Sequence, residues 1–494
     1  MMDTGRRTAI AFAIVSCLLV GLPFLFVRFP PITDLPQHSA QIKLFLETLA
    51  DRTSSPYTIQ WFTPYSLSYL LIGVSWFFFG AEYAGRAAML IVCLLWVVTI
   101  HLIAVRKGRS PAAAVLASVF ALNHVVYWGF YGFAVGWPAF GLWLLLTDRP
   151  CPDRFSPRDC LPVVGAALLL YLSHVLWFIM GVGWYCLRTA LFRDPPRGAL
   201  LRGACLIPLV LVTAVWYPVL SGSSMSTPPI WVTGPFERLG ASWLTDAALG
   251  GLTGPVEYAL TGIASAWVLL GIVQNRKDIV SSTDWGLVAA AGMFLLCALC
   301  LPDKYMNTIR LGQRWVPPAM IMLVLGFPVP ALRPVIRNGV AMAAAVAFAA
   351  VTTSSWLVFE RVELSGLKEA LAALPQNPRL VGLDLVQTSE VVKGRPFIQV
   401  FAYSQVFNGG LLNFSFAEFS PCLVVYKDAF LRPWTGGLEW FPQRLRESDL
   451  RYFDHALVNG TGGVHAVTAS NPAFKPVTTL GRWRLYRIEA GNTR

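Results

Sequence analysis

Asp34 and His38 are the two residues of this sequence whose types and position best suit catalysis at a membrane. They lie in the segment 30–38, directly after an apolar stretch at residues 8–28 that is long enough to cross a bilayer. A carboxylate has no role in packing a membrane bundle, whereas it can act as a general base on a lipid-borne substrate. Asp34 also suits the N-terminal cap of a helix that begins at Leu35, so this structural interpretation stays open.

Two further histidines are expected where helices reach the same side of the membrane. His124 lies near the end of the apolar segment 111–128, and His174 separates two later apolar segments. In a compact bundle these imidazoles and Asp34 would line one outward-facing cavity. Such a set of ligands suits Zn, Mn or Fe, which makes a divalent metal one interpretation. The other is that each imidazole forms a hydrogen bond with a backbone carbonyl between helices.

Lys304, Arg310 and Arg314 place positive charge in an expected outer loop at residues 302–314. Arginine presents a planar fork that binds phosphate through two contacts, and lysine adds a point charge. The loop therefore predicts a site for the phosphate of a lipid-linked donor. The alternative is that these side chains snorkel to the phosphates of membrane lipids.

The elements that position these residues are apolar helices. The chain has 494 residues, of which 55% are hydrophobic and 13% charged, and its mean hydropathy is +0.56. This composition excludes an ordinary soluble protein and predicts a polytopic α-helical membrane protein. One long helix or two short ones would fit residues 161–192. We expect about eleven transmembrane helices, at residues 8–28, 83–105, 111–128, 133–147, 161–174, 175–192, 203–221, 255–274, 283–301, 314–330 and 338–358.

The basic residues fall in alternate loops, which is the positive-inside pattern. This pattern places the N-terminus in the cytoplasm, and an odd number of spans then places the C-terminal part outside. The net charge of +12 is thus explained by topology, and we expect no nucleic-acid partner. The abundance of Ala, Leu, Arg and Pro indicates a bacterial inner membrane. The basic residues of the cytoplasmic loops are Arg6, Arg7, Arg106, Lys107, Arg109, Arg188, Arg193, Arg197, Arg202, Arg276, Lys277, Arg333 and Arg337.

Two outer loops are too long to be simple connections. The first, residues 29–82, contains an amphipathic helix from Leu35, expected on the membrane surface or against the bundle. Its second helix, near residues 65–80, is marginal in length for a span, so we interpret it as surface-lying or re-entrant. The other loop, residues 222–254, is rich in Gly, Pro and aromatic residues and is expected to form a lid or line a groove.

The C-terminal residues 359–494 predict a small external α/β domain that follows a transmembrane domain at residues 1–358. Charge rises there and long apolar runs cease. Cys422 is the one cysteine of this domain, so no disulfide is expected within it. The pattern predicts a helix at 364–374 and strands at 380–385, 455–458 and 483–488.

The layout of residues 1–358 resembles the GT-C superfamily of membrane glycosyltransferases. It is most similar to a bacterial group whose first outer loop carries an Asp-x-Pro-x-His element, which here runs from Asp34 to His38. The resemblance implies that Asp34 is the loop acid that acts as the base or positions the acceptor. It also implies that Arg310 and Arg314, with Lys304, hold phosphate. The chain departs from the family in two ways. Many members carry a paired Asp-Glu or Asp-Asp in the first loop, whereas Asp34 is followed by Leu35, and many have a second acid in the next outer loop, whereas residues 127–135 contain none. Either His124 substitutes for that acid or activity has been lost.

This resemblance implies transfer of a sugar from a polyprenyl-phosphate donor to an envelope glycan or lipid acceptor at the external face. Asp34, aided by His38, would take the acceptor proton, and the arginines would stabilise the leaving phosphate. Two alternatives stay open. One is a non-catalytic membrane protein of this fold that binds envelope components. The other is a transporter of a lipid-linked sugar, although no inverted repeat supports it.

Overall fold

A computed structural model describes residues 4–61, 63–148, 156–192, 194–221, 227–428 and 431–489. The chain forms two compact units. The helical unit consists of Met1–Leu25, Leu90–Val126 and Gly132–Thr352, and the mixed unit consists of Phe26–Met89, Tyr127–Tyr131 and Thr353–Arg494. The first outer loop and the C-terminal residues therefore belong to one unit. The domain boundary at residue 358 stays a prediction.

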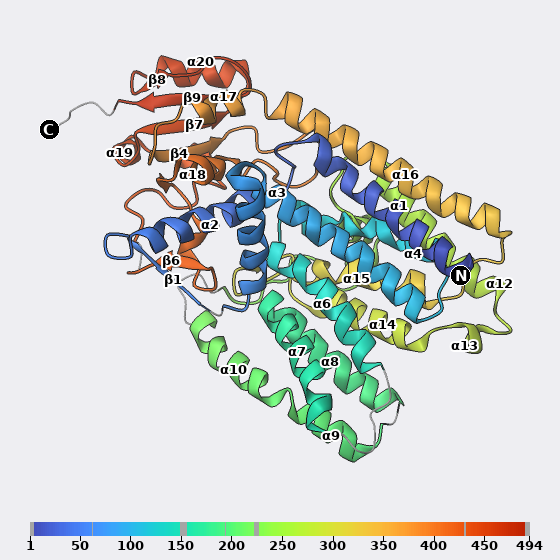
Figure 1. Ribbon diagram of the computed structural model, residues 1–494. Helices are drawn as coiled ribbons and strands as arrows, with labels where there is room; N and C mark the ends of the chain where they lie inside the picture. The colour runs from blue at the N-terminus through green and yellow to red at the C-terminus, as the bar shows by residue number, and fades with distance from the viewer. Residues whose placement is uncertain are drawn as a thin grey trace. The chain divides into compact units, whose positions relative to one another are not determined.

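The helical unit is built from long apolar helices (Figure 1), and each apolar segment predicted from the sequence is mainly helical. The segment at 161–192 forms two helices, which His174 separates in an extended conformation. The helices are α1 Thr4–Phe26, α3 Ser66–Arg106, α4 Pro111–Ser118, α5 His124–Trp128, α6 Tyr131–Thr147, α7 Pro157–Ser173, α8 Val175–Phe192, α9 Pro196–Ala204, α10 Ile207–Ser221, α11 Ala241–Ala248, α12 Val256–Gln274, α13 Ile279–Ser282, α14 Trp285–Cys300, α15 Val316–Gly326 and α16 Pro334–Val358. The first part of α3, up to Met89, and the last residues of α16 belong to the mixed unit.

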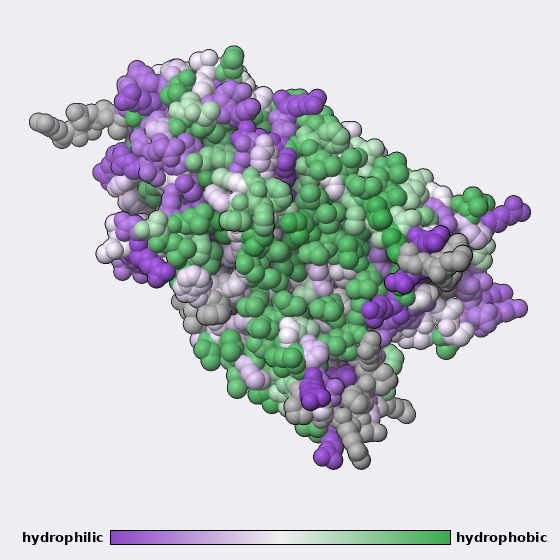
Figure 2. Space-filling model, viewed as in Figure 1, coloured by the Kyte–Doolittle hydropathy of each residue, from purple (hydrophilic) through white to green (hydrophobic). Residues whose placement is uncertain are grey.

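Six helices of the described residues are long and apolar enough to cross a membrane, or seven if the bent pair α9 and α10 forms one span. Their surfaces are strongly apolar, as Figure 2 shows over α1. Leu18 and Leu269, for example, are 64% and 61% exposed. Apolar surface of this extent requires lipid to cover it, so the chain is an integral membrane protein. The predicted number of eleven spans stays a prediction.

Aromatic side chains form the centre of the helical unit. Trp315 stacks on Phe294 with ring centroids 5.8 Å apart and meets Trp177 at 5.1 Å. Phe133 packs edge-on against Trp315 at 4.9 Å, and its carbonyl accepts a hydrogen bond from the Trp177 indole at 2.7 Å. Aromatic packing of this kind fixes how α6, α8, α14 and the 3-10 turn Gln313–Trp315 before α15 approach one another.

The mixed unit contains a five-stranded sheet with the order β5-β4-β7-β9-β8. Strand β4 is parallel to β5 and β7, while β9 is antiparallel to β7 and β8. The predicted helix at 364–374 is present as α17 Leu367–Ala372, and the three predicted strands are confirmed as β4, β7 and β9. The strands are β4 Arg379–Asp384, β5 Leu411–Leu412, β7 His455–Asn459, β8 Phe474–Pro476 and β9 Trp483–Ile488, and further helices are α18 Tyr403–Asn408, α19 Glu447–Leu450 and α20 Gly462–Ser470.

The first outer loop supplies helix α2, Leu35–Ala50, and strand β1, Tyr57–Ile59, to the mixed unit. Strand β1 pairs with β6, Val424–Tyr426, so the loop is joined to the C-terminal part by backbone hydrogen bonds (Figure 1). The predicted helix near 65–80 is present as the first part of α3, which breaks at Gly80, where φ is 73°. Its position on a membrane surface stays a prediction.

Helix α2 differs from expectation in its polar residues. The sequence predicts Gln37 and Gln41 on a face away from the apolar stripe, whereas both side chains are buried, and Leu46 and Leu49 are 43% and 37% exposed. The physical reason is that C-terminal residues pack on the glutamine face and form hydrogen bonds with the Gln37 amide and with the oxygen of the Gln41 amide. A buried amide is tolerated when it is hydrogen-bonded.

Candidate functional site

The backbone before α2 is held against residues 127–129. The N–H groups of Thr33 and Asp34 donate to the carbonyls of Tyr127 and Trp128 at 2.9 and 3.2 Å. Gly129 has a φ of +73°, and a Cβ at this position would lie 2.6 Å from the Asp34 nitrogen. The approach therefore requires glycine both for its conformation and for its lack of a side chain.

Asp34 occupies the N-cap position of α2, but its side chain makes no capping hydrogen bond to the helix. Its backbone is in the right-handed helical region, with φ −90° and ψ −3°, and Pro36 removes one of the N–H groups that a cap would use. The capping interpretation is therefore wrong in its expected form. Asp34 is a partly exposed carboxylate whose charge acts on the buried Cys422 thiol.

His38 lies one turn beyond Asp34, and its N–H donates to the Asp34 carbonyl at 3.1 Å. Its ring is hydrogen-bonded to the backbone of Gly129, while its Nδ1 is buried without a hydrogen-bond partner among the described residues. Burial lowers the pKa of His38 to about 4, so the ring is neutral at pH 7. With the proton held on Nε2 by the Gly129 carbonyl, Nδ1 is left as an acceptor.

Aromatic rings surround the imidazole. Phe416, Tyr69 and Tyr131 have ring centroids 5.1, 5.9 and 6.0 Å from that of His38. Tyr69 is also hydrogen-bonded to Cys422, and burial raises the pKa of this thiol to about 12. Cys422 is thus a protonated thiol that lacks the reactivity of a thiolate. Sequence reasoning missed Tyr69, Phe416 and Cys422, because nothing in the sequence links residues so far apart to Asp34.

The predicted cations lie in the helical unit. Arg314, in the 3-10 turn Gln313–Trp315, is 5% exposed and donates through Nε and Nη2 to the Ile309 carbonyl at 3.2 and 2.9 Å. Its guanidinium lies 5.7 Å from the centre of the Phe133 ring. Arg314 is therefore a buried cation held in a fixed orientation by a carbonyl and an aromatic face.

Both predicted histidines of the helical unit lie close to this cation. His124 and His174 are buried, and the charge of Arg314 acts on both rings. The charge of Arg310 also acts on His124. The His174 ring packs edge-on to Phe133 at 5.7 Å, and its Nδ1 accepts the N–H of Leu176 at 3.1 Å. His174 thus has a structural role at the start of α8 in addition to its place beside Arg314.

Arg310 differs from Arg314 in its surroundings. Its backbone is left-handed, with a φ of 52°, and its Nη1 donates to the Gln313 side chain at 2.8 Å. Burial lowers the pKa of Arg310, while the carboxylates of Asp246 and Asp303 oppose this change. Arginine nevertheless stays charged at any ordinary pH. The structure therefore places Arg310 and Arg314 close enough to His124 for both charges to act on its ring.

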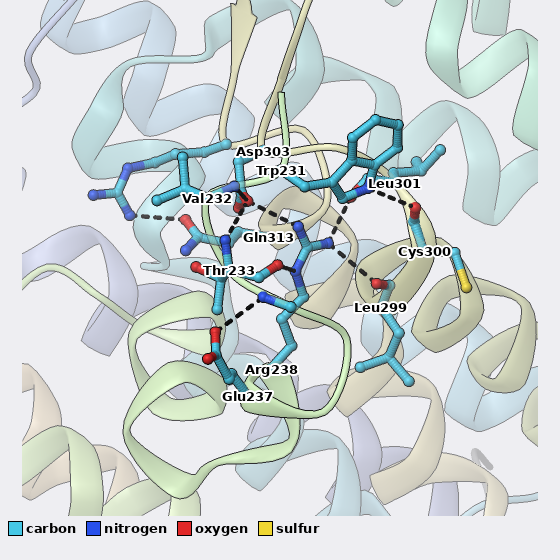
Figure 3. A network of polar contacts seen from close by, with 12 residues as sticks. Trp231, Val232, Thr233, Glu237, Arg238, Leu299, Cys300, Leu301, Asp303 and Gln313 are labelled. Carbon is cyan, nitrogen blue, oxygen red and sulfur yellow. Dashed lines mark hydrogen bonds and ion pairs between the residues drawn. The ribbon is translucent and has the colours of Figure 1, made fainter. Parts of the chain in front are cut away.

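A fully buried arginine anchors the loop that carries these cations (Figure 3). Arg238 forms an ion pair with Asp303 at 2.9 Å and donates to the carbonyls of Ala298 and Leu299. The same Asp303 carboxylate accepts the N–H groups of Val232 and Thr233 at 2.7 and 3.0 Å. This network joins the described part of the expected lid loop to residues 299–303.

Lys304 begins the short hairpin of strands β2, Lys304–Tyr305, and β3, Thr308–Ile309. Its backbone bridges to Ile230, and its side chain is half-buried. Among the described residues, no group of three or more His, Cys, Asp or Glu side chains is arranged to hold a metal ion. Asp34 and His38 thus belong to the mixed unit, and Lys304, Arg310, Arg314, His124 and His174 belong to the helical unit.

Comparison with known proteins identifies the architecture. The chain is similar to the crystal structure of ArnT from Cupriavidus metallidurans in the apo state, with 11% sequence identity, a TM-score of 0.52 and coverage of 99% of both chains. ArnT from Cupriavidus metallidurans bound to undecaprenyl phosphate matches with 12% identity and a TM-score of 0.50 over 98% of both chains. No protein-family model matches the sequence, and no curated protein matches it significantly. The chain has a GT-C-like membrane fold.

Proposed function

We propose that the protein is a membrane glycosyltransferase that moves a sugar from a polyprenyl-phosphate donor to a glycan or lipid acceptor. Its N-terminus is cytoplasmic and its C-terminal residues external, in a bacterial inner membrane. The observation that carries the proposal is the Asp34 carboxylate, which makes no cap for its own helix and lies one turn from a neutral imidazole. A carboxylate that does not cap its helix and lies near a neutral imidazole suits general base catalysis better than a role in stabilising the fold.

The donor class rests on two supports. The arginine group offers guanidinium forks that suit a phosphate, and ArnT, which shares the fold, has been crystallised with undecaprenyl phosphate. We assign Arg310 and Arg314 to the phosphate, with Lys304, His124 and His174 as further substrate-binding residues. A lipid phosphate as leaving group requires no soluble nucleotide sugar outside the cell.

In the proposed reaction an acceptor hydroxyl attacks the anomeric carbon of the sugar. Asp34, aided by His38, takes the hydroxyl proton as the new carbon–oxygen bond forms. The bond between the anomeric carbon and the phosphate oxygen breaks, and the polyprenyl phosphate leaves with the electron pair. Arg310 and Arg314 stabilise the charge that develops on this phosphate, as preorganised cations do.

The test is transfer by the purified protein in lipid nanodiscs, with radiolabelled undecaprenyl phosphate sugars and envelope extracts as acceptors. Asp34→Asn keeps the size of the side chain and removes the base, so the rate should fall about 10²–10⁴-fold. Asp51→Asn is the matched control, because Asp51 lies exposed at the other end of the same helix. Equal rates for wild type and Asp34→Asn would remove Asp34 as the base. A protein that turns over no donor would favour the non-catalytic interpretation.

A further inference from the structure

The imidazole of His38 is bounded by a side chain from the distant C-terminal part of the same unit. Phe416, in the 3-10 turn Phe416–Glu418, meets His38 edge-on with ring centroids 5.1 Å apart and an interplanar angle of 82°. Phe419 and Phe414 pack behind it, at 5.4 and 6.0 Å. Among the described residues, neither of these two rings forms a ring contact with His38. Phe416 is therefore the member of this aromatic cluster that faces the imidazole of His38.

Gln37 fixes the position of Phe416 relative to His38. Its buried amide accepts the Phe416 N–H at 3.2 Å and donates to the Phe414 carbonyl at 3.1 Å. The same nitrogen donates to the Gln399 side chain at 2.9 Å. Because Gln37 precedes His38 on α2, these bonds set the register between the imidazole and the phenyl ring.

The rest of this segment is anchored in the same way. Gln41, one helical turn after Gln37, accepts the Val424 N–H at 2.8 Å. Strand β6 then pairs with β1 of the first outer loop. The Phe416 turn is itself closed by Ser415 and Glu418, which form a capping box. Residues 413–426 are thus tied to α2 and β1 at several points, as a rigid wall requires.

We propose that Phe416 is a specificity-determining residue, which forms the wall of the acceptor site beside His38 and limits which sugar hydroxyl reaches the Asp34 carboxylate. Gln37 is the positioning residue of this wall. The inference rests on the proposed function, because it assigns the acceptor side of that reaction. Aromatic rings suit the apolar faces of a sugar ring, and the Asp34 carboxylate suits its hydroxyls. The expected acceptor is accordingly a sugar that offers a hydroxyl group and carries only small substituents on the side that meets Phe416.

The first experiment compares two acceptors that differ at C2, where the hydroxyl of octyl β-D-glucoside is replaced by the bulkier acetamido group of octyl N-acetyl-β-D-glucosaminide. Full-length protein in nanodiscs receives radiolabelled undecaprenyl phosphate sugar with each acceptor. Phe416→Ala should raise the relative rate with the bulkier acceptor about tenfold, the usual scale for a pocket that gains or loses a few methylene groups. Phe419→Ala removes a ring of equal size from the same cluster and should change this ratio less than about twofold.

The outcomes separate this inference from the proposed function. Equal changes in the ratio for Phe416→Ala and Phe419→Ala, or no change in either, would overturn Phe416 as the determinant. An absence of transfer in wild type with every donor and acceptor would instead overturn the proposed function. Phe416→Leu provides a milder change if the alanine variant unfolds, and its ratio should lie between those of wild type and Phe416→Ala.

A second readout needs no turnover. Ring signals of ¹³C-labelled histidine can be titrated in the full-length protein, which has six histidines, with the His38 signal assigned from His38→Gln. Removing the Phe416 ring should admit water and move the titration midpoint of His38 upward from about 4 towards 6.5, whereas Phe419→Ala should leave it in place. An unchanged titration midpoint of His38 in Phe416→Ala would show that the Phe416 ring does not shield His38. This result would overturn the proposal that Phe416 forms a wall beside the imidazole.

Discussion

The residues around His38 and those around Arg314 differ in the charge state that their surroundings favour. Around His38 in the mixed unit, burial among three aromatic rings keeps the imidazole neutral, although the hydrogen bond to the Gly129 backbone opposes this effect. Around Arg314 in the helical unit, a carbonyl and an aromatic ring hold a cation in place. A neutral ring beside a carboxylate suits proton transfer, whereas a fixed cation suits an anionic leaving group. Burial is thus used to suppress a charge in one group and to orient a charge in the other.

Arg238 shows what a purely structural arginine looks like in the same unit. It is fully buried and paired with Asp303 at 2.9 Å, and it also donates to the carbonyls of Ala298 and Leu299 near the end of α14 and to that of Thr233. Such a pair neutralises its own charge. Arg314 instead donates to the carbonyl of Ile309 and acts electrostatically on two histidines. The two arginines thus differ in the groups on which their charges act, which are a carboxylate for Arg238 and two imidazoles for Arg314.

Replacing Arg314 should give the largest effect on activity in the helical unit. Arg314→Gln keeps a donor but removes the charge, so kcat/KM for the polyprenyl-phosphate donor should fall about 10²–10³-fold, the scale of a lost transition-state donor. Arg276→Gln, at an exposed site after α12, is the control and should leave kcat/KM unchanged. Equal donor kinetics for wild type and Arg314→Gln would remove Arg314 from the phosphate site.

Gly129→Ala should be the most destabilising single change near Asp34. The new Cβ would lie 2.6 Å from the Asp34 nitrogen, in a backbone conformation with φ +73° that alanine rarely adopts. We expect a loss of about 2–4 kcal/mol from strain and overpacking together. Gly108→Ala has a similar φ of +63° and nothing within 4 Å of the new Cβ, so it should cost only about 1 kcal/mol. Thermal unfolding of both variants measures the difference, and equal unfolding temperatures would contradict the close approach.

Much of the fold follows from patterns that the sequence carries locally. Long apolar runs predict the helices, and short apolar or alternating runs predict β4, β7 and β9, because each depends on residues within one segment. The fit of α2 to the C-terminal part could not be predicted, since the partners of Gln37 and Gln41 lie more than 350 residues away. A glutamine at such a position is ordinarily assigned to a solvent-exposed face.

Some residues of the candidate site could likewise be predicted from the sequence, and others could not. Asp34, His38 and Arg314 could be selected from their residue types and their places beside apolar segments. Phe416 and Cys422 could not, because a phenylalanine or cysteine in a C-terminal domain resembles any other core residue. The neutral state of His38 also depends on burial by these residues, so it could not be inferred from the sequence.

The pH dependence of stability should report the neutral imidazole. Burial lowers the pKa of His38 from 6.5 to about 4, so between these values the unfolded chain binds a proton that the native protein does not. The stabilising contribution of neutral His38 is therefore present above about pH 6.5 and is lost as the pH falls towards 4. The difference in unfolding temperature between wild type and His38→Gln should shift against wild type from pH 7 to pH 5.

The other titratable groups near His38 should not disturb this comparison. Asp34 lies on the same helix, and Tyr69 and Tyr131 face the ring from α3 and α6. All three are present in both variants, as are the remaining histidines, so their own titrations largely cancel in the difference. If the difference in unfolding temperature between wild type and His38→Gln stays constant from pH 7 to pH 4, the imidazole is not shielded.

Cys422→Ser should have the smallest effect, although Cys422 lies close enough to Asp34 for its charge to act on the thiol. Burial raises the pKa of the thiol to about 12, so fewer than about one in 10⁴ molecules carries a thiolate at pH 7. The serine hydroxyl is of similar size and can keep a hydrogen bond to Tyr69, so the transfer rate should stay within about twofold of wild type. A rate loss of the size expected for Asp34→Asn would mean that the thiol takes part in the chemistry. The mixed unit would then hold a nucleophile in addition to a base, and the division of roles between the two units would no longer hold.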